Sequence, residues 1–147
     1  MQRRAFLQWM AGLSAVTLLL PIRALAALWN RAAFESQDVQ GALQGLEVST
    51  EIPSEDIEIT APERAENGAV VQVEVRSRIP DTEAIAIIAE KNPTPLIANF
   101  MFSRGAEPFV ITRIKMAETS NIQAIVKSGD KYYIAKRMVV VLENGCN

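Results

Sequence analysis

The stretch Val71-Gln72-Val73-Glu74-Val75-Arg76 decides the fold, because valines alternate with polar residues over its whole length. Strict alternation puts every second side chain on the same face of an extended strand, so one face is apolar and the other is polar. Turn-forming residues bracket the stretch, with Asn67-Gly68 before it and Pro80-Asp81 after it. We therefore predict a β-strand with one face against a hydrophobic core.

Further segments with β character follow on both sides, separated by turn signals. The last two are joined through Ser128-Gly129-Asp130, which predicts a hairpin, and Asn92-Pro93-Thr94-Pro95 forms a rigid connection. About seven strands at roughly 8–12-residue spacing favour an all-β, immunoglobulin-like sandwich built as one domain. The expected strands besides the central one are 57–60, 83–90, 97–103, 109–117, 121–127 and 131–143.

The segment from Glu83 to Glu90 differs from the other strands, because both of its faces are apolar. Ile85 and Ile87 fall on one face, and Ala84, Ala86 and Ile88 fall on the other. A strand of this kind is buried on both sides, either by a second layer of the same chain or by another protein.

A short amphipathic helix is expected from Ser36 to Leu46, ahead of the strands. Its apolar stripe has helical spacing, and Ser36 is a plausible N-cap. We expect this helix to lie over one end of the core. The residues of the stripe are Val39, Ala42, Leu43 and Leu46.

The first 26 residues have the pattern of an export signal. Arg3-Arg4 precedes an apolar stretch, and Ala24-Leu25-Ala26 is a small-residue cleavage pattern. Adjacent arginines indicate the twin-arginine route, so we expect a periplasmic protein with residues 27–143 as the folded domain and 144–147 as a tail.

Removing the leader changes the charge of the chain. Three of its 15 basic residues (Arg3, Arg4 and Arg23) leave with it, so 12 remain against 17 acidic ones, a net charge of −5. This acidic balance argues against nucleic acid and against an anionic membrane as partners of the mature protein.

Asn144-Gly145-Cys146-Asn147 ends the sequence, and Cys146 is its only cysteine. Chain ends lie at the surface, so a cysteine here contributes little to a core. It could be incidental, it could link two chains of an interaction subunit through an intermolecular disulfide, or it could be reactive. Its position favours a thiol presented to another protein, with Asn144, Gly145 and Asn147 giving the tail its flexibility. A thiol oxidoreductase or redox sensor is less favoured, because a resolving cysteine is missing.

The chemistry of an enzyme is largely missing from the sequence. There is no histidine, which removes the Ser-His-Asp and Cys-His arrangements and the commonest metal ligand. The acidic neighbours Glu55-Asp56 and Glu63/Glu66 lie in polar stretches, and Arg113 and Lys115 share one strand face. We interpret all six as solvated surface, and we expect neither a metal nor a catalytic set.

Several short motifs carry a resemblance to a known family, and they extend over essentially the whole chain after the leader. The chain resembles the SoxY family, the sulfur-carrier subunit of the periplasmic sulfur-oxidation (Sox) system. Family members end in Gly-Gly-Cys-Gly-Gly, whereas this chain keeps one flanking glycine and ends in asparagine. The motifs are Ala65-Glu66-Asn67-Gly68 with the valines after it, Ala89-Glu90-Lys91-Asn92-Pro93, Thr112-Arg113-Ile114-Lys115-Met116, Thr119-Ser120 and the terminal Gly145-Cys146.

The resemblance implies that Cys146 is the covalent attachment point for thiosulfate-derived sulfur. It implies a heterodimer with a SoxZ-like subunit, loading by the haem enzyme SoxAX, release of sulfate by SoxB, and in some organisms oxidation by a SoxCD-like enzyme. The carrier itself would catalyse nothing and hold no cofactor apart from the bound sulfur species. The strand at 83–90 is then a candidate for the surface that faces SoxZ.

Overall fold

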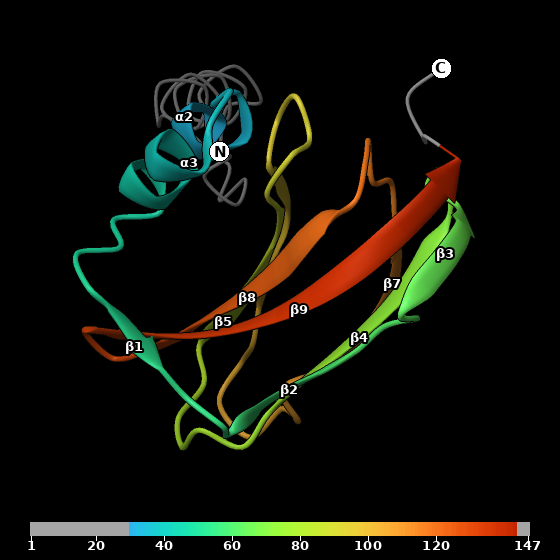
Figure 1. The fold of residues 1–147 in the computed structure, drawn as a ribbon. Coiled ribbons are helices and arrows are strands. Elements are labelled where there is room, and N and C mark those ends of the chain that lie inside the picture. The colour runs from blue at the N-terminus through green and yellow to red at the C-terminus, as the bar shows by residue number, and fades with distance from the viewer. Residues whose placement is uncertain (1–29, 144–147) are drawn as a thin grey trace, which may run out of the picture.

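Two β-sheets packed face to face form the protein, and two short helices lie at one end (Figure 1). The computed structural model describes residues 30–143, so the predicted export signal with Arg3 and Arg4 and the predicted tail 144–147 lie outside the described residues. The expected all-β, immunoglobulin-like sandwich is confirmed. Within 30–143 the elements are α2 (Arg31–Phe34), α3 (Val39–Gly45), β1 (Glu51–Pro53), β2 (Ile57–Thr60), β3 (Arg64–Asn67), β4 (Val71–Ser77), β5 (Ala84–Ala89), β6 (Leu96–Met101), β7 (Phe109–Ile114), β8 (Ser120–Ser128) and β9 (Lys131–Glu143).

The larger sheet has the strand order β1-β9-β8-β5-β6, and β3 also pairs with β9. The smaller sheet has the order β2-β4-β7. Neighbouring strands are antiparallel except that β1 and β3 both run parallel to β9. The predicted hairpin between β8 and β9 is present, with Ser128 opposite Lys131 across the turn.

The alternation that opened the sequence analysis is realised in β4. Val71, Val73 and Val75 are buried between the sheets, while Gln72 faces solvent. Their partners across the sandwich include Ile87 of β5, in one continuous hydrophobic cluster. Apolar burial of this kind is the main stabilising contribution to a β-sandwich.

Strand β5 is buried on both faces by its own chain. Ile85 and Ile87 belong to the cluster between the sheets, whereas Ala86 and Ile88 belong to a second cluster with the helices. The sequence predicted that a second layer covers the outer face of this strand, and that layer is the helical segment. The suggestion that this strand forms a SoxZ-facing surface is wrong, because all its residues are already covered.

The helical segment begins differently from the prediction. The helix starts at Val39, not Ser36, and its N-cap is Asp38, whose side chain accepts a hydrogen bond from Gly41 N–H. Asp38 displaces Ser36 as the cap because its carboxylate reaches the first turn, while Ser36 bonds to Asp38 itself. The additional helix α2 packs against α3, where Gly45 lies directly on the backbone of Ala33. Neither helix of the described chain is long and apolar enough to cross a membrane.

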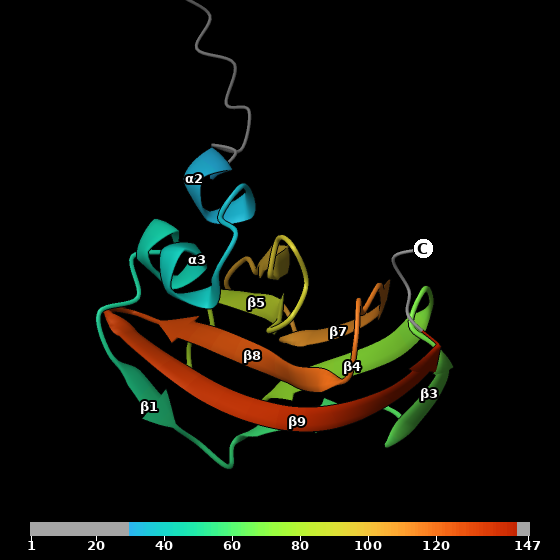
Figure 2. The ribbon, with the colours of Figure 1, turned by 45° about the horizontal axis from the view of Figure 1, so that its top comes forward.

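Strands β1 and β3 were not expected, and both cover the same edge of β9. The chain pairs with the first part of β9 as β1, crosses to the smaller sheet as β2, and returns to the last part of β9 as β3 (Figure 2). Asn67-Gly68 is thus a turn, but it does not close a hairpin between β3 and β4, because β3 pairs with β9 instead.

Candidate functional site

The end of β9 is the part of the described chain that leads to Cys146, which itself lies outside the described residues together with Asn144, Gly145 and Asn147. We call Val140–Glu143 the tail root. On one side β3 pairs with it, and the register places Arg64 opposite Val140 and Asn67 opposite Glu143. The tail root is therefore held in a sheet up to its last residue.

Two backbone hydrogen bonds add to this pairing from outside the strand. Gly68 N–H donates to the Glu143 carbonyl oxygen at 2.9 Å, and Val140 N–H donates to the Glu63 carbonyl oxygen at 2.9 Å. The turn after β3 thus reaches as far along the chain as Glu143. This accounts for a turn at Asn67-Gly68 without a hairpin.

Thr119 holds the other side of the tail root. Strand β8 begins at Ser120, opposite Val139, so no residue of β8 is left to pair with Val141. The Thr119 hydroxyl replaces that partner, because Oγ1 accepts from Val141 N–H at 2.9 Å and donates to the Val141 carbonyl oxygen at 3.4 Å. In the sequence Thr119 stood out only through the family resemblance, since no periodic pattern marks a hydroxyl that extends a sheet.

The side chains of β9 that point inward also hold the tail root against the hydrophobic core. Val139 and Val141 are buried in the cluster between the sheets, together with Ala65 of β3. Because three residues span at most roughly 10 Å, the Cys146 backbone lies no farther than that from Glu143. The last residue of β9, Glu143, lies at one end of the sandwich, away from α2 and α3 (Figure 1).

A polar cluster lies on the outer face of the larger sheet, at the N-terminal end of β8. Its residues are Glu90, Asn121, Gln123 and Lys136. Asn121 Nδ2 donates to Glu90 at 3.1 Å, Gln123 Nε2 also donates to Glu90, and Lys136 Nζ lies 3.5 Å from it. Partial burial raises the pKa of Glu90, but the hydrogen bonds from Gln123 and Asn121 and the charge of Lys136 outweigh it, so the pKa is lowered overall. The cluster stabilises the sheet and keeps Glu90 ionised.

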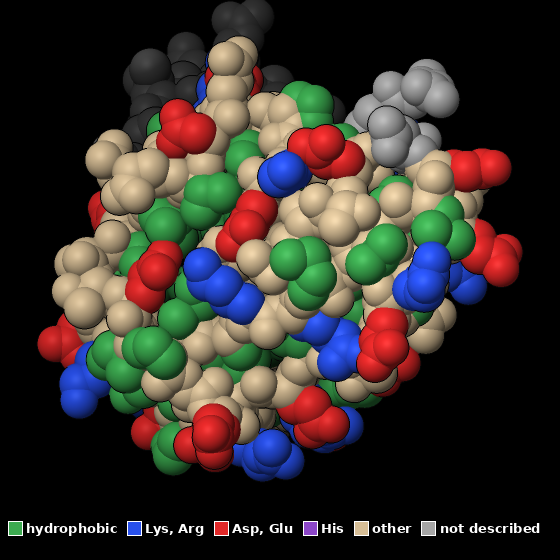
Figure 3. Space-filling model, in the orientation of Figure 1, with side chains coloured by type: hydrophobic (Ala, Val, Ile, Leu, Met, Phe, Trp, Pro, Cys, Tyr) green, Lys and Arg blue, Asp and Glu red, His purple; other side chains and the backbone are tan. Residues whose placement is uncertain are grey.

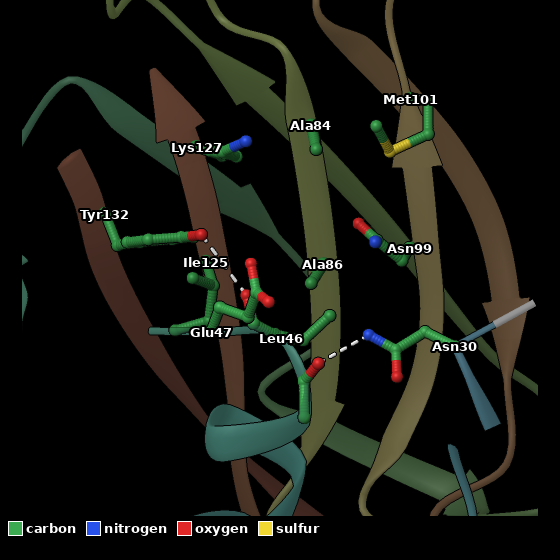
Figure 4. A pocket seen from close by; sticks show the side chains of 11 residues that line it. Asn30, Leu46, Glu47, Ala84, Ala86, Asn99, Met101, Ile125, Lys127 and Tyr132 are labelled. Carbon is green, nitrogen blue, oxygen red and sulfur yellow. Dashed lines mark hydrogen bonds between the residues drawn. The ribbon is translucent and has the colours of Figure 1, made fainter. Parts of the chain in front are cut away.

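A cavity of about 320 Å³ lies near the start of β9, at the opposite end of this strand from the tail root. It is enclosed between the end of α3 and the larger sheet (Figure 4). Tyr132 donates a hydrogen bond to the Leu46 carbonyl oxygen at 3.2 Å across it. Its cation, Lys127, is already paired with Glu83 at 3.3 Å. Its other charged side chain is Glu47, no cysteine, serine or threonine lines it, and we assign the cavity to the attachment of the helices.

The charged residues that the sequence analysis interpreted as surface are indeed exposed. Glu55, Asp56 and Glu63 face solvent, as do Arg113 and Lys115, while Glu66 is exposed on β3 and not in a loop. Within residues 30–143 no group of three or more acidic side chains is placed to hold a metal ion.

The chain is similar to known proteins in sequence and in fold. A family model described as sulfur oxidation protein SoxY matches residues 44–146, so the matched range ends at Cys146. The solved structure of the sulfur carrier protein SoxY from Chlorobium limicola f thiosulfatophilum is 36% identical, covers 77% of this chain and 99% of that chain, and superposes with a TM-score of 0.66. A superoxide reductase (neelaredoxin) from Ignicoccus hospitalis is 22% identical over 58% of this chain and 78% of its own, with a TM-score of 0.49. Comparison with curated protein sequences gives no match.

Proposed function

The chain belongs to the SoxY family of sulfur carrier proteins, and on this basis we propose that Cys146 is the residue on which it carries sulfur. Membership places the protein in sulfur oxidation as a carrier. The observation that supports Cys146 as the sulfur-carrying residue is the family match. The match runs up to this residue, which is the only cysteine of the chain. The cysteine also follows an anchored strand end by three residues, within roughly 10 Å.

The carried group is a product of thiosulfate. The Cys146 thiolate and the outer sulfur of thiosulfate form an S–S bond, and two electrons leave to a haem enzyme of the SoxAX type. Water then attacks the sulfonate sulfur in a SoxB-like enzyme, which releases sulfate and two protons and leaves a persulfide on Cys146. A SoxCD-like enzyme oxidises that remaining sulfur in hosts that have one.

The protein's own residues supply placement and no catalysis. The thiolate is the reactive form of a cysteine, and a positively charged partner site would favour it, so ionisation is left to the partner. We further propose a SoxZ-like subunit as the stable partner, and export to the periplasm through Arg3-Arg4 with cleavage after Ala26.

Intact-protein mass spectrometry of the protein from thiosulfate-grown cells tests the proposal. We expect thiosulfonate or persulfide adducts that a reductant removes, and none in a Cys146→Ser variant. A bare thiol in cells that load a standard SoxY would refute the carrier role of Cys146. A disulfide-linked dimer on a non-reducing gel, with full activity and no adduct, would instead support a purely structural cysteine.

A further inference from the structure

A carboxylate without a partner faces into the cavity between the end of α3 and the larger sheet. Figure 4 shows the Glu47 side chain between Ile125 and Ala86, which line the same cavity. Within residues 30–143 the side chain of Glu47 makes no hydrogen bond and no ion pair. The ammonium group of the lining, that of Lys127, is already paired with Glu83 at 3.3 Å. The cavity therefore contains an acceptor for a positive charge that the described chain does not supply.

Small and apolar side chains form the floor and one wall of this cavity. The floor includes Ala84 and Ala86 of β5, so a hollow remains where longer residues would fill the space. In the wall, Met101 of β6 is 70% exposed, the largest exposed fraction among the large hydrophobic residues of 30–143. Figure 3 shows hydrophobic side chains interspersed with charged ones over the surface, so exposure alone is ordinary in this protein. Met101 differs because it borders a cavity, whose occupant must combine an apolar body with a positive charge.

The described chain begins at the rim of the same cavity. Asn30 lines it, and its side chain is held there, because Nδ2 donates to the Gly45 carbonyl oxygen and Oδ1 accepts from Ala33 N–H at 3.2 Å. In the sequence, Ala27-Leu28-Trp29 directly precedes Asn30. With cleavage after Ala26, this tripeptide is the start of the mature chain and carries its α-ammonium group. It therefore has both the positive charge and the apolar side chains that the cavity requires.

We propose that the cavity is the binding site for the mature N-terminus, with the indole of Trp29 over the alanine floor and the α-ammonium group of Ala27 paired with Glu47. This inference rests on the cleavage site in the proposed function and goes beyond the carrier role. Three residues reach up to roughly 10 Å from Asn30, and Asn30 and Glu47 line one cavity. The thioether of Met101 adds a favourable contact with an aromatic ring.

The bound N-terminus fixes the two helices to the larger sheet. Asn30 is the N-cap of α2, and its bond to Gly45 joins it to the last residue of α3. The helices already cover Ile88 and Ile134, and the N-terminus closes the adjacent part of the same sheet face. In the uncleaved precursor the nitrogen of residue 27 is a neutral amide, so it cannot pair with Glu47. Removal of the leader therefore completes the attachment of the helices.

Fluorescence of Trp29 tests the proposal, because the only other tryptophan, Trp9, leaves with the leader. The protein is expressed as the full chain and purified from the periplasm, and N-terminal sequencing identifies its first residue. Acrylamide quenching then measures how much of the indole is open to solvent, with the urea-unfolded protein as the reference.

Two variants change the cavity, and each has a matched control. Glu47→Gln removes the unpaired charge, and Glu55→Gln makes the same change at an exposed residue outside the cavity. Met101→Gln makes the wall polar, and Met138→Gln is its control, since Met138 is 54% exposed on β9 and lies outside the cavity. All four residues replaced are exposed, so the variants should fold.

We expect Trp29 of the wild type to be quenched at least about threefold more slowly than in the unfolded protein, because a pocket buries roughly 70–90% of its occupant's surface. Glu47→Gln should raise the ratio of open to bound indole about twofold to fivefold, the range for an exposed ion pair, and about 1 M salt should do the same to the wild type. Met101→Gln should also raise this ratio, and both controls should match the wild type.

Quenching of the wild type at the unfolded rate overturns the proposal, as does equal quenching of the Glu47 and Glu55 variants. Protection that disappears on dilution also overturns it, because a second copy of the chain would then cover Trp29. A first residue other than Ala27 refutes the proposed cleavage, and the pair with Glu47 falls with it. Adduct formation on Cys146 tests the carrier role separately, and all four variants should load like the wild type.

Discussion

Replacing Glu90 with glutamine removes the charge at the centre of the polar cluster and keeps the shape of the side chain. In the wild type, Asn121 and Gln123 each donate a hydrogen bond to a different carboxylate oxygen. A glutamine offers only one oxygen, so one of these donors faces an NH₂ group. Gln123 is 3% exposed and cannot turn to water for a replacement. Loss of this contact leaves a buried polar group without a partner.

The size of the effect follows from the contacts. A hydrogen bond to a charged group contributes about 1.5–3 kcal/mol, and the half-exposed pair with Lys136 contributes up to about 1 kcal/mol. We expect Glu90→Gln to lower the free energy of unfolding by about 2 kcal/mol at pH 7. Glu118→Gln is the control, because Glu118 pairs with Lys91 at 3.6 Å with both side chains more than half exposed. It should change stability by less than about 0.5 kcal/mol.

Urea unfolding at a series of pH values measures both the effect and its sign. The pKa of Glu90 is lowered in the folded protein, so its ionised form adds stability above the unfolded pKa, and this is lost as pH falls through the folded pKa. The gap between wild type and Glu90→Gln should therefore close on acidification. Equal stability of the Glu90 and Glu118 variants at pH 7, or a gap that widens in acid, would refute the reasoning.

Two further predictions concern the attachment of the tail root and of the helices. Thr119→Val should lose about 1 kcal/mol and speed amide hydrogen exchange at Val141, whereas Thr119→Ser, which keeps the hydroxyl, should change little; equal exchange in both variants would contradict the assigned role. Gly45→Ala should separate α2 from α3, because its new Cβ would lie 2.6 Å from the backbone nitrogen of Ala33. Loss of the helical circular dichroism signal with the β signal intact would confirm this separation. An unchanged spectrum and an unchanged melting temperature would contradict it.

The strands with a periodic pattern could be predicted from the sequence. Alternation in 71–76 identified β4 because burial on one face leaves a period of two, and Ile85 to Ile88 indicated a doubly covered strand because both faces are apolar. Strand β3 could not be found in this way. Arg64–Asn67 contains one buried side chain, Ala65, and is extended because β9 offers it an edge, a partner more than 70 residues away.

Residue types also do not reveal which apolar residues stay exposed. Lys131–Glu143 was predicted as one long apolar strand, and within it Val139 and Val140 are chemically identical. Val139 is buried and Val140 is exposed only because the second layer covers one face of β9 and α3 stops short on the other. The exposure of Met138, Val140 and Leu142 is therefore a finding of the structure. Cys146 stood out in the sequence because its position in the chain, and not its packing, made it unusual.

The parallel placement of β3 along the tail root has a mechanical consequence. Hydrogen bonds to β3 and β8 run across β9, so a pull applied along the strand from its C-terminal end strains them all together in shear, and does not unzip them one by one. A force applied at the C-terminal end of β9 is therefore resisted by the hydrogen bonds to both neighbouring strands at once. The sandwich then moves as one rigid body, and β9 does not separate locally from β3 and β8.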